Sequence, residues 1–508
     1  MSEPLSVDGR SLTLEQFLEV VRRDRPVVLT SDARAALTSS RGAVERAVAG
    51  GRAVYGVTTG FGALSDRPIS PSQARELQRS LVRSHASGTG PPLPRDVVRG
   101  LALLRLNSLA QGHSGIRVDV ADRLVAILDR GLVPWIPEQG SVGASGDLAP
   151  LAHLALALIG EGAFVGRSGM PEPAREALDR EGIAPLELVE KEGVALLNGT
   201  ALMASYLALS VADARELLDA ALIAAALSYD ALEGTPESLD DRLGEVRNSS
   251  DQREVARSLR GLLDGSQLTV HRTAWTGQDP YTLRCIPQVL GAARLAIGFA
   301  ETVVAGELNA VTDNPIVFEP DEFVNGGNFH GQPLALALDT LALGVQYIAG
   351  FSERRVARLV DPARSRGLPA FLSPEPGVSS GFMVPQYLAA ALVNENATLV
   401  HPASATSLPT SADQEDFVSM GPWAGHKLRR VLENTRRAVA VEWIVAGQAL
   451  ELRHPRLGGR GSEAALRALR ARVAPWTRDR SPAPDIERVA AAIASGELVR
   501  EVRSQAPF

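Results

Sequence analysis

A series of long segments with helical spacing is the feature that most constrains the fold. Their apolar residues, mainly Ala and Leu, recur every three or four positions. They cover about 201–233, 287–311, 332–361, 385–400 and 425–452. Small Ala side chains let helices approach closely, so these segments predict the centre of a bundle. Patterns that alternate every second residue are scarce, with "VFEPDEFVNGGNF" as one short candidate. The sequence therefore predicts an all-α fold with a long central helical bundle, and no doubly wound sheet.

The 508-residue length predicts more than one structural part, because single hydrophobic cores stop growing well below this size. We expect an N-terminal loop-rich helical domain over 1–200 and the long-helix bundle over 201–454. The tail over 455–508 is more charged and is broken by prolines, so it is expected to form a C-terminal helical arm.

Composition and charge exclude several classes of protein. The net charge of −7 is spread along the chain without a basic block, so a nucleic-acid partner is not expected. The most apolar window, "LLDAALIAAALSYDALEG", is too short to span a bilayer, and the first residues lack the pattern of a secretory signal. One cysteine and eight scattered histidines give no disulfide framework and no metal-ligand spacing. These features favour a cytoplasmic protein without a metal site.

The loops between the helical segments carry the residues that are typical of a functional site. They are rich in Gly, Pro and hydroxyl residues, and they also contain Tyr, Phe, Gln, Asn and Arg. Their motifs are "YGVTTGFG" (55–62), "GSVGASGD" (140–147), "QDPYTLRC" (278–285), "NFHG" (328–331) and "QEDF" (414–417). "GASGD" departs from the G-x-S-x-G elbow of serine hydrolases, and "YGVTTGFG" has two close glycines but no third at the spacing of a dinucleotide-binding loop. The loop motifs therefore do not indicate either of these common chemistries.

Together with "GSVGASGDLAPLAHLAL" and "LLNGT", these motifs resemble the histidine/phenylalanine/tyrosine ammonia-lyase family, and most closely its histidine ammonia-lyases. The similarity extends from about residue 50 to about residue 452, with the motifs in the family order. It implies an ammonia-lyase (fumarase/aspartase-like) helical architecture with active sites built from loops. It also implies a homotetramer whose active sites draw loops from more than one subunit, an amino acid substrate, and no need for a metal or a diffusible cofactor.

The resemblance implies that Ala144, Ser145 and Gly146 cyclise into 4-methylideneimidazole-5-one. The residue types suit that reaction independently. The amide nitrogen of Gly146 must attack the carbonyl of Ala144, and glycine has no Cβ to obstruct the approach. Ser145 must lose its hydroxyl as water, which leaves an electrophilic methylidene that no unmodified side chain supplies. A helix expected to begin near Asp147 would direct its positive end towards this site.

The resemblance also assigns roles to residues in the other motifs. Tyr55 corresponds to the general base that removes the β-proton, which requires an environment that favours the phenolate. Asn198 and Tyr281 correspond to a pair that contacts the prosthetic group and the substrate amine. Arg284 is the candidate for binding the substrate carboxylate, because its planar fork matches that group.

Three further residues are expected in supporting positions around the substrate. Gln278 and Asn328 are interpreted as hydrogen-bond donors, and Phe329 is expected to pack against the substrate ring. Each of these residue types also occurs as an ordinary loop or core residue.

The residues that select the substrate give a mixed indication. His85, preceded by Ser84, and the carboxylate of Glu415 resemble histidine ammonia-lyases, and a carboxylate can accept a hydrogen bond from an imidazole N–H. Thr58 and Phe417 depart from the usual histidine-lyase pattern towards that of the aromatic lyases and aminomutases. The sequence therefore favours conversion of L-histidine to trans-urocanate. A tyrosine or phenylalanine ammonia-lyase, or a 2,3-aminomutase with the same prosthetic group, stays open as the alternative.

Overall fold

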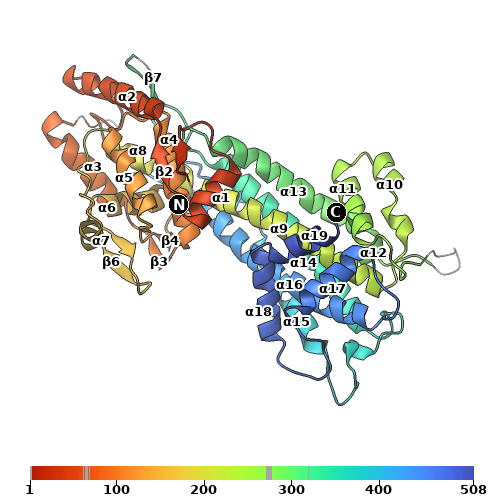
Figure 1. The fold of residues 1–508 in the computed structure, drawn as a ribbon. Coiled ribbons are helices and arrows are strands. Elements are labelled where there is room, and N and C mark those ends of the chain that lie inside the picture. Colours follow the sequence, from red (N-terminus) through yellow and green to blue (C-terminus); the bar gives the residue numbers. More distant parts are fainter. Residues whose placement is uncertain (1–2, 61, 63–66, 68, 271–276, 319) are drawn as a thin grey trace. The chain divides into compact units, whose positions relative to one another are not determined.

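A computed structural model describes residues 3–60, 62, 67, 69–270, 277–318 and 320–508. The predicted motif at 55–62 therefore lies partly outside the described residues. The chain forms two compact units, whose elements are labelled in Figure 1. The first unit comprises Met1–Leu209, Glu301–Leu338 and Pro402–His426, and the second comprises Ser210–Ala300, Asp339–His401 and Lys427–Phe508. The division into 1–200, 201–454 and 455–508 stays a prediction.

Short and medium helices dominate the first unit. They are α1 (Leu14–Arg23), α2 (Ser31–Ala49), α3 (Pro71–His85), α4 (Arg95–Ala110), α5 (Val118–Asp129), α6 (Leu148–Leu158), α7 (Ala174–Arg180), α8 (Glu192–Leu197) and the 3-10 turn η5 (Ala403–Ala405). Helices α3, α6 and α8 pack against one another. Nearly every residue of α4 is buried, which is the burial expected of a central helix.

Four two-stranded sheets tie down loops of the first unit. The pairs are β1 (Leu5–Val7) with β2 (Val27–Leu29), β3 (Thr89–Pro92) with β4 (Pro137–Gln139), β5 (Ala163–Val165) with β6 (Pro171–Pro173), and β7 (Ile316–Phe318) with β8 (Glu322–Val324). The first pair is parallel and the others are antiparallel. The β7–β8 pair lies in the one region where the sequence predicted a strand. The β3–β4 pair holds the segment that follows α3 beside the segment that precedes Gly140.

Long helices form the bundle that the sequence predicts. The five helices that correspond to the predicted segments are α9 (Ala201–Ala231), α13 (Ile286–Glu307), α14 (Gln332–Val360), α15 (Met383–Leu399) and α16 (Gly421–Glu451). The second unit contains α15 and the greater part of the other four long helices. It also contains η2 (Pro236–Leu239), α10 (Asp241–Val246), α11 (Ser250–Leu262), α12 (Tyr281–Arg284), η4 (Ala370–Leu372), α17 (Arg460–Arg470), α18 (Ala483–Ala494) and α19 (Glu497–Gln505). The helical fold class predicted from the sequence is confirmed.

Polar contacts fix the register of the bundle helices inside the second unit. The fully buried pair Arg355–Glu442 joins α14 to α16, with nitrogen–oxygen distances of 2.5 and 2.9 Å. Ser228 of α9 donates to the same carboxylate at 2.6 Å. Trp443 of α16 donates its indole N–H to the carbonyl of Ala220 in α9 at 2.8 Å. Because buried polar groups must be paired, these contacts oppose sliding of one helix along another.

Two bundle helices, α13 and α14, are long and apolar enough to cross a membrane by length and composition alone. The most apolar stretch of α14 is 61% buried within the protein, and its C-terminal half carries the buried Arg355–Glu442 pair. The corresponding stretch of α13 is only 33% buried. Core helices of a bundle satisfy the same length and composition test.

Candidate active site

A cavity of about 670 Å³ in the first unit brings together five of the predicted site residues. Its lining includes Tyr55, His85, Ser145, Asn198 and Glu415, which come from five separate segments of the chain. Apolar side chains from α3, α6 and α8 complete its walls. The volume lies in the range of small-molecule sites, and the mixture of apolar walls with a few polar groups is typical of them.

The Ala144-Ser145-Gly146 triplet lies in a tight turn at this cavity. Gly143, Ser145 and Gly146 have φ angles of 88°, 46° and 85°, and the amide of Gly146 donates to the carbonyl of Gly143 at 3.3 Å. A left-handed φ at Ser145 is strained for a residue with a side chain, and such strain clusters at functional sites. Helix α6 begins at Leu148, which confirms the predicted helix start next to Asp147.

Gly199 forms backbone hydrogen bonds with the residues on both sides of Gly146. Its amide donates to the carbonyl of Ser145 at 3.1 Å, and its carbonyl accepts from the amide of Asp147 at 2.7 Å. A Cβ on Gly146 would lie 2.0 Å from the oxygen of Gly199 and 3.0 Å from the backbone oxygen of Phe329. Glycine is therefore required at 146 both by the backbone angle and by the close approach of two other segments.

Asp147 links the triplet to the start of α9. Its carboxylate is fully buried and accepts from the amides of Leu202 and Met203, at 2.7 and 3.2 Å. Burial raises the pKa of Asp147 to about 7, although these two hydrogen bonds act in the opposite direction. The carboxyl group is therefore held close to its protonation midpoint at neutral pH, directly beside the triplet.

Asn198 is oriented by contacts to both hydrogens of its amide nitrogen. Nδ2 donates to the carbonyl of Asn314 at 2.7 Å and to Oδ1 of Asp313 at 3.3 Å. The second oxygen of Asp313 accepts from Nζ of Lys191 at 2.8 Å, and both side chains of that ion pair are fully buried. Asn198 can therefore contribute only its oxygen, a hydrogen-bond acceptor, to the cavity that it lines.

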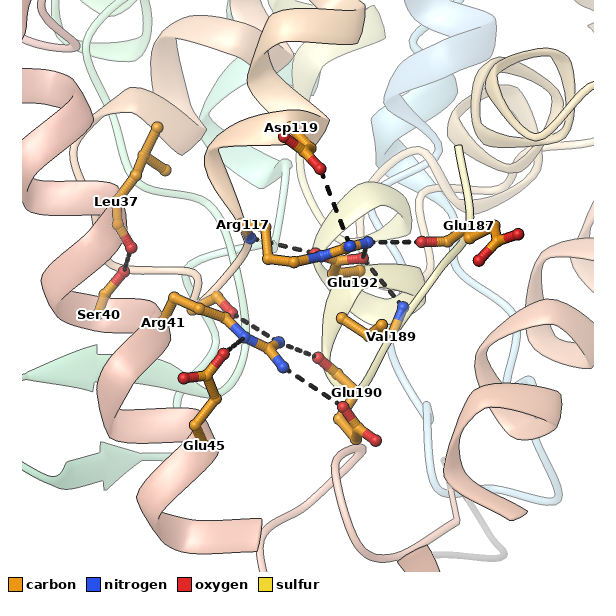
Figure 2. Close-up of polar contacts among 11 residues, drawn as sticks. Leu37, Ser40, Arg41, Glu45, Arg117, Asp119, Glu187, Val189, Glu190 and Glu192 are labelled. Atoms are coloured by element: carbon orange, nitrogen blue, oxygen red, sulfur yellow. Dashed lines mark hydrogen bonds and ion pairs between the residues drawn. The ribbon is translucent and has the colours of Figure 1, made fainter. Parts of the chain in front are cut away.

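The segment that leads to Asn198 is fixed by two arginines, as Figure 2 shows. Arg117 forms a two-pronged ion pair with the buried carboxylate of Glu192, at 2.8 Å to each oxygen, at the first residue of α8. Arg41 of α2 donates to the carbonyl of Glu190 at 2.8 Å and pairs with its side chain at 3.3 Å. Bidentate pairs set orientation as well as distance, so the path from 190 into α8 is fixed.

His85 and Glu415 are polar groups of the cavity that can distinguish one aromatic ring from another. Nδ1 of His85 lies 2.9 Å from the carbonyl of Leu81, which can only accept, so Nδ1 carries the proton and Nε2 is an acceptor. Burial lowers the pKa of His85, and the Leu81 contact and the nearby Glu415 carboxylate act against this shift. Oε2 of Glu415 accepts from the hydroxyl of Thr410 at 2.9 Å.

Two loops meet at the wall of the cavity in the first unit. The hydroxyl of Tyr55 accepts from the amide of Gly62 at 3.1 Å, and a Cβ on Gly62 would lie 2.7 Å from Oγ of Ser411. Ser411 and the next two residues all have left-handed φ angles of 52° to 65°. The loop that carries Glu415 therefore turns sharply beside the loop that carries Tyr55.

The two residues that depart from the histidine-lyase pattern do not belong to the cavity lining. The hydroxyl of Thr58 donates to the carbonyl of Arg52 at 2.9 Å and accepts from the amide of Val54 at 2.9 Å, so it closes a backbone turn. Phe417 is 58% exposed and its ring stacks on His330 at 6.2 Å between centroids. Neither side chain therefore lines this cavity within the first unit.

Asn328 and Phe329 lie beside the triplet through their backbone. The Phe329 carbonyl approaches Gly146, as described above, and Phe329 is half-buried. Asn328 is exposed and donates to the carbonyl of Val311 at 3.2 Å. Neither side chain is among the described residues that line the cavity.

Three predicted site residues belong to the second unit. Gln278 and Arg284 line a separate cavity of about 490 Å³ in that unit. The guanidinium of Arg284 lies over the ring of Tyr281, 4.7 Å from its centroid, and its buried Nε has no partner among the described residues. Tyr281 is 67% exposed. Arg284, the predicted carboxylate-binding residue, and Ser145 therefore belong to different units.

Comparisons with known proteins show the family to which the chain belongs. Residues 12–471 match the family model described as aromatic amino acid lyase. The chain is 50% identical to the histidine ammonia-lyase of Symbiobacterium thermophilum, with 98% of each chain covered. The structure of tyrosine aminomutase from Streptomyces globisporus is 38% identical with a TM-score of 0.94, covering 100% of this chain and 99% of that one. Histidine ammonia-lyase from Trypanosoma cruzi is also 38% identical, with a TM-score of 0.92, covering 99% and 96%.

The protein is thus a helical carbon–nitrogen lyase by fold and by family. The chain belongs to the aromatic amino acid lyase family, which uses a 4-methylideneimidazole-5-one prosthetic group.

Sequence reasoning did not single out Arg105, Lys191 and Asp313, which surround Asn198. One signal was present, because Arg105 interrupts the apolar run "LALLRLNSL". A charged residue in a helix that is apolar on all sides is buried and needs a partner. The identity of that partner could not be read from the sequence.

Proposed function

We propose that this protein eliminates ammonia from L-histidine to give trans-urocanate. The cavity that joins Ser145, Tyr55 and Asn198 to the pair His85 and Glu415 is the observation that carries this proposal. Its polar groups provide two hydrogen-bond acceptors, Nε2 of neutral His85 and the Glu415 carboxylate. A neutral imidazole ring has one N–H to donate to either acceptor, and an imidazolium ring has one for each, whereas a benzene ring has none. The full-length similarity to histidine ammonia-lyases supports the same substrate.

The residues at 144–146 fit the prosthetic group. The left-handed turn and the side-chain-free Gly146 suit closure of a five-membered ring, and Ser145 lines the cavity. The ring would be held by Ala144, Ser145 and Gly146 themselves, and by Gly199 through its amide. When formed, this group supplies an electrophile at the position of the Ser145 side chain, which activates an amino group as a leaving group.

The side chains of the protein provide the remaining chemistry. Tyr55 is the proposed base for the β-proton, and its place in the cavity lining puts it within reach of a bound substrate. The Asn198 oxygen is proposed to accept a hydrogen bond from the substrate amine. Apolar residues Leu81, Leu148 and Leu197 line the same cavity and exclude water from around the ring.

Gln278, Tyr281 and Arg284 are proposed to complete the site from another subunit of a homotetramer. Arg284 would bind the substrate carboxylate, Tyr281 would contact the amine, and Gln278 would add a donor. Asn328 and Phe329 are proposed to support the substrate from beside the triplet. Apolar side chains exposed on the bundle helices support assembly, since a monomer rarely exposes long apolar faces. They include Leu295 and Phe299 of α13, Leu336 and Tyr347 of α14, and Val384 and Tyr387 of α15.

The cytoplasm is proposed as the compartment, since the one cysteine, Cys285, is unpaired. A small amino acid is proposed as the partner, with no nucleic acid, metal or diffusible cofactor required. An aromatic lyase or a 2,3-aminomutase is the second candidate, favoured by the similarity in structure to a tyrosine aminomutase.

The decisive experiment is an assay of the purified protein with histidine, tyrosine and phenylalanine separately. Urocanate, coumarate and cinnamate absorb at different wavelengths, and chromatography detects a β-amino acid product. Rapid formation of urocanate supports the proposal. Turnover of tyrosine without turnover of histidine, or accumulation of a β-amino acid, would overturn it in favour of the second candidate.

A further inference from the structure

Arg105 of α4 is a fully buried cation whose position is not explained by a charged partner of its own. Its Nη1 donates to the backbone carbonyl of Asn198. Its Nε and Nη2 are buried and have no hydrogen-bond partner among the described residues. Leaving two donors of a charged group unpaired is costly, so a purely structural role accounts poorly for this residue.

The cluster around Arg105 has an excess of positive charge. Arg105 and Lys191 are both fully buried, and Asp313 is the buried carboxylate that acts on both of them, whereas the buried carboxylate of Glu192 is already paired with Arg117. Asp313 forms its ion pair with Lys191 at 2.8 Å and acts on Arg105 only at longer range. Burial lowers the pKa of Arg105, and Asp313 opposes that shift. One positive charge therefore remains in a low-dielectric interior, where its field acts strongly on the nearest dipole.

The nearest dipole is the peptide unit between Asn198 and Gly199. Arg105 binds the carbonyl at one end of this unit, and the amide at the other end donates to the Ser145 carbonyl at 3.1 Å. The guanidinium also packs directly on Gly199, since a Cβ at that position would lie 2.5 Å from Nη1. A cation on the carbonyl polarises the amide, so the hydrogen bond to Ser145 becomes stronger.

The Ser145 carbonyl oxygen is where negative charge develops when Ser145 loses water. The Cα–H bond breaks, and its electron pair forms the Cα=Cβ double bond while the Cβ–Oγ bond breaks. The departing hydroxide carries off the proton as water. Charge building up on Cα is shared with the adjacent carbonyl oxygen as an enolate, and a strong donor at that oxygen lowers the barrier.

We propose that Arg105 is a positioning residue for maturation of the prosthetic group: it polarises the Asn198–Gly199 peptide so that Gly199 stabilises the enolate oxygen of Ser145. The inference rests on the proposed function, because it requires the triplet to cyclise. It concerns formation of the group in this chain, separately from substrate turnover.

The test measures the rate of maturation by mass. The full chain is synthesised in a cell-free reaction, sampled over time, and analysed by intact mass for the loss of two water molecules. Arg105→Gln keeps a donor but removes the charge, and we expect it to mature about ten- to a hundredfold more slowly than the wild type. Arg105→Lys restores the charge and should recover part of the rate.

Arg99→Gln is the matched control. Arg99 lies on the same helix, is 2% exposed, and likewise donates to backbone carbonyls, those of Leu128 and Val20. The Arg99→Gln chain should mature at the wild-type rate even if the substitution lowers its stability. Circular dichroism of each chain verifies the helical content.

Three results would overturn the inference: Arg105→Gln maturing at the wild-type rate, Arg105→Lys maturing as slowly as Arg105→Gln, or Arg99→Gln maturing equally slowly. If Arg105→Gln does not fold, Arg105→Met, which removes the charge without leaving an unpaired donor, is compared with Arg105→Lys, and equal rates contradict the role. A wild-type chain that retains both waters while turning over substrate would instead refute the proposed prosthetic group.

Discussion

Replacing Glu415 by Gln tests the basis of substrate selection. Oε2 of Glu415 already accepts from the Thr410 hydroxyl at 2.9 Å, so the other oxygen is the one available to a ring N–H. If the Gln oxygen takes over the Thr410 contact, its NH₂ group faces the imidazole N–H donor to donor. If the amide turns round, a neutral acceptor replaces a charged one. Both outcomes weaken binding of the imidazole.

The size of the effect follows from the charge on this hydrogen bond. Hydrogen bonds to charged groups contribute about 1.5 to 3 kcal/mol, which corresponds to a loss of about 10- to 150-fold in kcat/KM for histidine. The larger loss of kcat/KM is expected if the Gln amide presents its NH₂ group to the imidazole N–H. Loss of the carboxylate also lowers the pKa of His85 further, so the neutral acceptor at Nε2 is kept.

The assay compares initial rates with histidine and with phenylalanine for the same preparation. The ratio of the two kcat/KM values should shift towards phenylalanine, because a benzene ring makes no hydrogen bond to Glu415. Asp416→Asn is the control, since Asp416 is the next residue of the same loop and is exposed. An unchanged histidine rate in Glu415→Gln, or an equal loss in Asp416→Asn, would refute this account of selectivity.

Three further predictions concern the triplet and its surroundings. Gly146→Ala should retain both water molecules by intact mass with its helical content unchanged, because the new Cβ would lie 2.0 Å from the Gly199 oxygen; loss of both waters would contradict the required close approach. Phe417→His should leave the ratio of histidine to phenylalanine turnover within about twofold, because an exposed surface position contributes little; a larger change would show that this residue reaches the substrate. Burial raises the pKa of Asp147 from 3.8 to about 7, so the neutral carboxyl group stabilises the folded state fully below pH 4. The free energy of unfolding should therefore fall by about 4 kcal/mol as the pH rises to 7 and the group ionises. The melting temperature of Asp147→Asn should accordingly fall less than that of the wild type between pH 5 and pH 8, and parallel curves would argue against a raised pKa.

The long helices were predictable because their signal repeats over many turns. The segment at 201–233 corresponds to α9, which ends at Ala231, and that at 332–361 to α14, which ends at Val360. The start of α16 was predicted late, at about 425, whereas the helix begins at Gly421 and has Pro422 in its first turn. Proline is compatible with a first helical turn, where its missing N–H has no partner to lose.

Short strands were largely not predictable. A three-residue strand such as β1 has no room for a measurable alternation, and its hydrogen bonds go to β2, some twenty residues away. The β7–β8 hairpin was the exception, because its two strands are adjacent in the chain and together supply enough alternation.

The sequence alone determined the reaction class. The motifs in family order carry the resemblance that implies it, and the small residues at 144 and 146, with a hydroxyl between them and a helix start after them, suit that chemistry. It also nominated the residues that meet in the cavity, through motifs that each lie within a few consecutive positions.

Only the tertiary structure decided how these residues act. The orientation of Asn198 depends on Asp313 and Asn314, more than a hundred residues away, and its carbonyl accepts from Arg105 of α4. The same applies to Thr58, whose hydroxyl is engaged in a backbone turn. Burial and hydrogen-bond partners are properties of packed neighbours, and no local pattern in a chain specifies which distant segment supplies them.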